Sequence, residues 1–142
     1  PDQLSRLVAA VPQQPHLFNS TIRENILLGR EIPDEQLSAV LADSGLKQWI
    51  AGLPQGLETP VGETGSAVSG GEARRIALAR ALVSKAPILL LDEPTEGLDG
   101  AIEQSVVQHL KDRLQGTTVL VVTHRPACLA LAQRVVRIGK TV

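Results

Sequence analysis

Two segments of the sequence place residues that suit phosphate and metal chemistry at the ends of predicted elements. The first, Ser69 to Glu72, is a polar turn that opens a predicted helix, and the second, Asp92-Glu93, ends an apolar run. Free N–H groups at a helix N-terminus bind phosphate, and carboxylate oxygens bind hard cations such as Mg²⁺. The stretch from Val68 to Asp99 therefore predicts a site for a phosphorylated ligand.

Asp92 and Glu93 follow the apolar run 88–91, and His124 follows a second apolar run at 117–122. Ligands of open α/β sheets collect beyond the carboxyl ends of the strands, and these three residues are predicted to lie there. Successive side chains of a strand diverge, so Asp92 and Glu93 can take separate tasks. One carboxylate can hold Mg²⁺ while the other orients and deprotonates a water molecule, and His124 can contact that water or a phosphoryl oxygen. A solvated turn that ends the strand is the simpler alternative.

Ser69, followed three residues later by Glu72, also has the form of a capping box, which by itself explains a helix start. Gly70 and Gly71 indicate a further role for this helix start, because each glycine costs roughly 1 kcal/mol of helix stability relative to alanine. Glycine is favoured where the backbone must come close to another group. A nucleotide phosphate would account for them. Gln13, in the loop after the first predicted strand, is either a bridge between a metal ion and water or an exposed loop amide.

Alternating apolar and amphipathic segments predict an α/β fold built on a parallel sheet. Strands are expected at 7–11, 88–91, 117–122 and 135–138, and helices at 21–29, 33–45, 46–53, 68–85, 99–114 and 127–132. A long loop is expected at 54–67. The unbroken aliphatic run at 88–91 predicts a strand that is covered on both faces.

The composition limits the classes of partner and compartment. The 142 residues suit one domain, and a net charge of -1 without long charged runs argues against a nucleic-acid partner. Cys128 is the single cysteine, which predicts a small buried side chain and a reducing compartment. No apolar run approaches the ~18 residues of a membrane span.

Five motifs in one order resemble the ATP-binding domain of ABC transporters of the exporter type. They read VPQQPHLF with TIRENI, TPVGETG, VSGGE, ILLLDEPTEGLD and VVTH. The resemblance implies these roles: Gln13 (or, in another register, Gln14) as the Q-loop glutamine at ATP and the metal ion; Ser69, Gly70, Gly71 and Glu72 as the ATP-binding signature; Asp92 as a metal ligand; Glu93 as the catalytic base; Asp99 as the D-loop aspartate at ATP; and His124 as the catalytic switch histidine.

The resemblance also implies a P-loop NTPase-like parallel sheet, with a helical signature subdomain at about 20–85 and the Walker B and H-loop part of the core at about 86–142. The sequence departs from the family in having no G-x-x-x-x-G-K-[ST] motif. We therefore expect residues 1–142 to be a partial domain, truncated at the N-terminus, that by itself binds ATP weakly and is inactive. The TPVGETG loop departs as well, with Pro60 and Thr64 where glutamate and arginine are commoner.

The implied function is an ATP- and Mg²⁺-dependent motor of an exporter at the cytoplasmic face of the bacterial inner membrane. Its implied partners are a second ABC ATP-binding domain, identical or different, and a transmembrane domain of the same chain, with no nucleic acid. The segments SGGE, DEPTEGLDG and VVTHRPA are most similar to bacterial cysteine and glutathione exporters. Lipid or drug exporters are the alternative, followed by ATPases of DNA repair and chromosome maintenance, in which a coiled coil is expected just before SGG.

Overall fold

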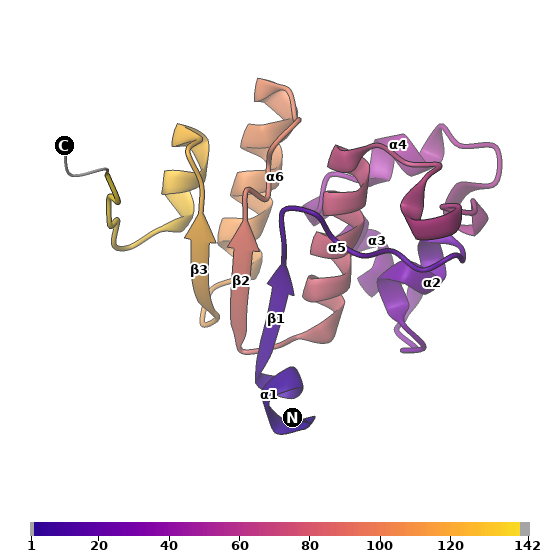
Figure 1. The fold of residues 1–142 in the computed structure, drawn as a ribbon, viewed down its shortest axis with the longest axis horizontal. Coiled ribbons are helices and arrows are strands. Elements are labelled where there is room, and N and C mark those ends of the chain that lie inside the picture. Colours follow the sequence, from indigo (N-terminus) through magenta and orange to yellow (C-terminus); the bar gives the residue numbers. More distant parts are fainter. Residues whose placement is uncertain (1, 140–142) are drawn as a thin grey trace.

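The computed structural model describes residues 2–139 of the chain. The helices are α1 (Asp2–Leu7), α2 (Ile22–Leu27), α3 (Asp34–Asp43), α4 (Lys47–Ala51), α5 (Gly70–Ser84) and α6 (Gly100–Arg113), and the strands are β1 (Val8–Val11), β2 (Ile88–Asp92) and β3 (Thr118–Val122). Short 3-10 helices lie at Gly56–Glu58, Glu63–Gly65 and Pro126–Leu131. In Figure 1 the sheet lies on one side of α5, and α2, α3 and α4 gather on the other.

The three strands form a parallel sheet in the order β1-β2-β3, which confirms the predicted α/β class. Residues 12–87, whose last helix is α5, connect β1 to β2, and α6 lies in the connection from β2 to β3. The register pairs Val11 with Leu91 and Asp92 with Val122, so the carboxyl ends of all three strands lie at one edge. The loops that carry the predicted site leave the sheet from this edge.

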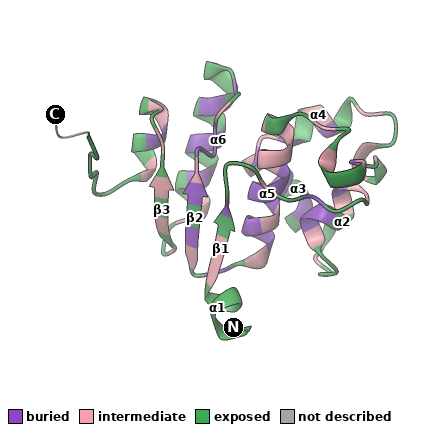
Figure 2. Cartoon of the chain, in the orientation of Figure 1, coloured by how far each residue is buried: buried purple, intermediate pink, exposed green. Residues whose placement is uncertain are grey.

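Strand β2 is covered on one face, so the prediction of a strand covered on both faces is wrong for the described residues. Leu89 and Leu91 are 2% and 1% exposed and share a core with the buried side chains of α5 and α6. Leu90, which points to the opposite face, is 38% exposed, and Leu120 beside it is 60% exposed. Side chains alternate between the faces of a strand, and no element within residues 2–139 covers the second face (Figure 2).

Both ends of the described chain differ from the prediction. Residues 2–7 form α1, so Leu7 ends a helix and β1 starts one residue later. The strand predicted at 135–138 is wrong, because this segment is irregular and its Val136 and Ile138 are 70% and 96% exposed. An apolar run becomes a strand only where a neighbouring strand offers hydrogen bonds, and 135–138 pairs with none within the described residues.

The predicted helices are present with shifted ends, and the one predicted at 127–132 is the 3-10 helix Pro126–Leu131. Thr21 caps α2 by accepting a hydrogen bond from the Glu24 N–H at 3.1 Å, while the Glu24 carboxylate bonds to Ser20 and does not complete a capping box. The loop at 54–67 contains two of the 3-10 helices, and its Val61 is fully buried. This loop is therefore fixed against α2 and is not structureless.

Asn25 joins the loop after β1 to α2 and α5. Its amide is fully buried; Oδ1 accepts from the Phe18 N–H at 2.8 Å and from Arg80 at 3.2 Å, and Nδ2 donates to the carbonyls of Phe18 and Thr21. We expect Asn25→Ala to lower the free energy of unfolding by about 2 to 4 kcal/mol, because it leaves buried polar groups without hydrogen-bond partners. Urea unfolding of the chain measures this loss. Asn19→Ala, at an exposed position, is the control, and equal stabilities of the two variants would contradict the expectation.

Candidate nucleotide-binding site

The loops after the three strands bring most of the predicted catalytic residues to one edge of the sheet. Gln13 follows β1 by two residues, Glu93 follows β2 directly, and His124 follows β3 by two residues. Because these strands are parallel and in register, their loops open on the same side. Glu93 and His124 lie at this edge, as predicted, and are in direct contact with each other.

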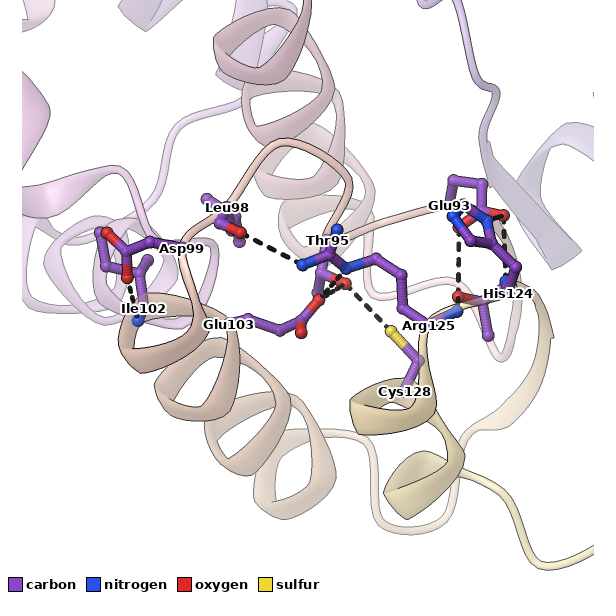
Figure 3. A network of polar contacts seen from close by, with 10 residues as sticks. Glu93, Thr95, Leu98, Asp99, Ile102, Glu103, His124, Arg125 and Cys128 are labelled. Carbon is purple, nitrogen blue, oxygen red and sulfur yellow. Dashed lines mark hydrogen bonds and ion pairs between the residues drawn. The ribbon is translucent and has the colours of Figure 1, made fainter.

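Glu93 is buried, and both its backbone and its carboxylate are hydrogen-bonded. Its φ of 48° lies in the left-handed region, and its N–H donates to the Val122 carbonyl at 2.8 Å. Carboxylate Oε2 accepts from the Thr123 hydroxyl at 3.1 Å, while Oε1 accepts from the His124 N–H at 3.1 Å and lies 2.6 Å from His124 Nδ1 (Figure 3). A non-glycine residue with positive φ is costly, and such strain concentrates at functional sites.

The surroundings of Glu93 favour its ionised form. Burial raises the pKa of the carboxyl, but the hydrogen bonds from His124 and Thr123 outweigh burial, so the pKa lies below its ordinary value. A general base must be ionised before it can accept a proton, and Glu93 meets this condition. The His124 side chain is 75% exposed, which leaves the imidazole accessible to a ligand.

Asp92 and Gln13 lie on adjacent strand ends, which suits the metal role predicted for them. Asp92 is half-buried at the end of β2, and Gln13 is exposed in the loop after β1. Among the described residues no group of three or more acidic, histidine or cysteine side chains could hold a metal ion. Mg²⁺ commonly takes one or two protein oxygens and fills its octahedron with water and phosphate oxygens, so one carboxylate and one amide oxygen fit this ion.

Ser69 starts α5 with the predicted capping box. Its hydroxyl accepts from the Glu72 N–H at 3.2 Å, and the Glu72 carboxylate accepts from the Ser69 N–H at 2.7 Å. The glycines between them are not required by crowding, since a Cβ on Gly70 or Gly71 would approach other atoms no closer than 3.8 and 3.4 Å. Neither has a positive φ. The fold itself gives no reason for two glycines here, which favours close approach by a ligand.

Asp99 is the N-cap of α6 and accepts a hydrogen bond from the Ile102 N–H at 3.0 Å. Its side chain stands apart from the Glu93 and His124 pair in Figure 3. The turn before it lies close to the start of α5, because a Cβ on Gly97 would be 4.0 Å from the Gly71 Cα. The predicted residues thus form two groups: the strand-end residues, and the N-termini of α5 and α6.

The sequence prediction missed a buried polar network between these two groups. The Glu103 carboxylate accepts from the Thr95 hydroxyl at 2.6 Å and pairs with Arg125, and the Thr95 hydroxyl lies 3.1 Å from the Cys128 Sγ (Figure 3). The hydrogen bond from Arg125 lowers the pKa of Glu103 more than burial raises it. A signal was present, because Glu103 shares a helix face with Val106, Val107 and Leu110, where an apolar residue is expected.

A second missed residue, Arg74 on α5, contacts the loop after β1. Its Nε donates to the Gln13 carbonyl at 2.9 Å, and its Nη2 lies 3.5 Å from the Glu96 carboxylate. Cys128 is buried as predicted, but it contacts a hydroxyl rather than only apolar groups.

The comparisons with known proteins agree with this fold. The family model described as ABC transporter matches residues 1–96, and the chain belongs to that family. It is 43% identical over 134 residues, 94% of the chain, to the glutathione/L-cysteine transport system ATP-binding/permease protein CydC of Escherichia coli, covering 23% of that protein. It is also 43% identical to CydD of Bacillus subtilis, over 99% of the chain and 25% of that protein.

Relatives with other named substrates match almost as well. The ATP-dependent lipid A-core flippase of Chromobacterium violaceum is 41% identical over 94% of the chain and 23% of that protein. A solved bacterial Atm1-family ABC exporter with ATP bound has a TM-score of 0.82 and 38% identity over 90% of the chain and 23% of that structure. The chain thus spans about a quarter of these proteins and is part of the ATPase domain of an ABC exporter.

No helix among residues 2–139 has both the length and the apolar character that crossing a membrane requires. The names of the two glutathione/L-cysteine relatives combine an ATP-binding part with a permease part.

Proposed function

We propose that the full-length protein to which this chain belongs hydrolyses ATP as the motor of an exporter, with Glu93 as the general base that deprotonates the attacking water. The observation that carries this proposal is the ionised Glu93 carboxylate, strained and hydrogen-bonded to His124 at the carboxyl edge of the sheet. His124, with its exposed ring, contacts the γ-phosphate or the water. Asp92 and Gln13 would hold Mg²⁺, which when bound would supply positive charge to balance that of the phosphate oxygens.

We further propose that two such domains sandwich ATP. The N-terminus of α5, with Ser69, Gly70, Gly71 and Glu72, contacts nucleotide that is bound mainly by the other domain, and Asp99 contributes from the start of α6. Support comes from the exposure of Ser69, Gly70 and Asp99 and from the uncrowded glycines. In this assignment residues 20–85 are the helical signature subdomain and 86–142 belong to the core. Both domains act below a transmembrane domain at the cytoplasmic face of the bacterial inner membrane.

For the transported substrate, glutathione or cysteine is the first choice. It rests on 43% identity to CydC and to CydD, together with the EGLD sequence at 96–99. A lipid substrate is the second candidate, because the lipid A-core flippase is 41% identical.

The test uses the full-length polypeptide that carries this chain, reconstituted in inside-out vesicles. We expect ATP to drive uptake of labelled glutathione or cysteine at least several-fold above the rate without ATP, and Glu93→Gln to abolish the ATP-dependent part. Lipid A movement in the same vesicles, without thiol uptake, would favour the second candidate. Hydrolysis that leaves both compounds unmoved would refute both substrates.

A further inference from the structure

We propose that Arg125 is a positioning residue, which holds the loop carrying His124 against the turn that leads to Asp99. The inference rests on the proposed ATPase function and adds a part to it. Arg125 follows His124 directly, and its guanidinium reaches across to two residues of the neighbouring segment, Glu103 and Leu98 (Figure 3). No residue of this network is among those proposed to touch ATP.

The anchor for Arg125 is buried and preorganised. Glu103 is 7% exposed, and its Oε2 accepts both the Arg125 Nε–H and the Thr95 hydroxyl. Thr95 is fully buried in the turn two residues after Glu93. Since buried charges remain ionised only when they are paired and hydrogen-bonded, Arg125 has little freedom to leave Glu103.

A second nitrogen of the Arg125 guanidinium contacts the backbone. Arg125 Nη2 donates to the Leu98 carbonyl at 3.2 Å, and Leu98 directly precedes Asp99. The Arg125 N–H donates to the Thr123 hydroxyl at 3.0 Å, which in turn donates to the Glu93 carboxylate. Arg125 therefore connects the histidine loop to the turn before α6 through its side chain, and to the proposed base through its backbone N–H and Thr123.

Residues 123 and 124 also contact the 93–99 turn directly. Among the described residues, every such side-chain contact is made with the Glu93 carboxylate. A water molecule that binds the general base competes with these donors for the carboxylate oxygens and can displace one of them. When it does, a contact that does not involve Glu93 has to keep His124 in place. The Arg125 contacts with Glu103 and Leu98 satisfy this requirement.

The test compares Arg125→Lys with wild type in ATP hydrolysis by the full-length polypeptide. Lysine keeps a charge for Glu103, but its single ammonium lacks the planar fork that reaches Glu103 and the Leu98 carbonyl together. We expect kcat to fall about tenfold, with the KM for ATP within about twofold of wild type and the Tm nearly unchanged.

Glu103→Gln is the second variant, and we expect it to affect stability more than catalysis. It preserves shape and an acceptor for Thr95, and it leaves the Arg125 contact with Leu98 possible, but it removes the charge that pairs with the guanidinium. We expect it to lower the Tm more than Arg125→Lys does and kcat less. If the kcat losses instead follow the Tm losses in both variants, the network only stabilises the fold and the proposal is wrong.

Arg113→Lys is the matched control, because Arg113 makes a similar ion pair through Nε with Asp43 near the far end of α6. We expect its kcat to stay within about twofold of wild type. Glu93→Gln in the same assay separates the two proposals. If Glu93→Gln is inactive and Arg125→Lys hydrolyses like wild type, only the positioning role fails; if Glu93→Gln remains active, the proposed function itself fails.

Discussion

Replacing Glu93 by glutamine is expected to slow ATP hydrolysis by the full-length exporter by a factor on the order of 10² to 10⁴, the usual contribution of general acid–base catalysis. The amide cannot take a proton from water, while its oxygen can still accept the His124 N–H that now binds Glu93 Oε1. The loop geometry should therefore survive. Steady-state phosphate release measures the loss, and equilibrium nucleotide binding should remain near the wild-type value.

Glu96→Gln is a matched control three residues away in the same turn. Glu96 lies 3.5 Å from Arg74, and its side chain is partly exposed, so losing this charge should cost at most about 1 kcal/mol of stability. We expect its hydrolysis rate to stay within about twofold of wild type. Equal rates for Glu93→Gln and wild type would remove Glu93 from the role of base.

The edge where the site assembles could be predicted from the sequence. Unbroken aliphatic runs that end in Asp92-Glu93 and in Thr123-His124 predict parallel strands, and parallel strands present their carboxyl ends together. The contact between Glu93 and His124 follows from this topology. The capping box at the start of α5 was predictable as well, because it depends on residues three positions apart.

The exposure of the sheet was not predictable in the same way. An aliphatic run indicates that a strand can be covered on both faces. The exposed side chains of Leu90 and Leu120 show that only one face of the sheet is covered among the described residues. The run at 135–138 is also mostly apolar, yet it has no strand partner within the described residues. In both cases the local composition favours a covered strand, but contacts with distant parts of the chain determine whether one forms.

The buried network around Glu103 could not be derived from local patterns. It brings together residues from the 93–99 turn, α6 and the segment after β3, which are 8 to 33 positions apart in the sequence. The left-handed conformation of Glu93 is likewise set by the pairing of its N–H with β3 and not by its residue type. Charged residues at apolar helix positions are the clue that such networks leave.

Replacing Gly70 or Gly71 by alanine is expected to separate a structural role from a ligand-binding role. The space around both residues admits a Cβ, with the nearest atoms at 3.8 and 3.4 Å on arginine side chains that can move. Alanine favours the helix by up to about 1 kcal/mol over glycine, so each variant should be as stable as wild type or more stable. If phosphate must approach this backbone, the added methyl group should lower hydrolysis at least about tenfold in the full-length polypeptide.

Gly100→Ala provides the control at an equivalent helix position. Gly100 follows the Asp99 N-cap of α6 as Gly70 follows the Ser69 N-cap of α5, and nothing lies within 4 Å of a Cβ built on it. Its stability should change like that of Gly70→Ala, with hydrolysis unchanged. A gain in stability with full activity in all three variants would mean that the glycines of α5 serve no ligand, and the start of this helix would then be only a well-capped helix end.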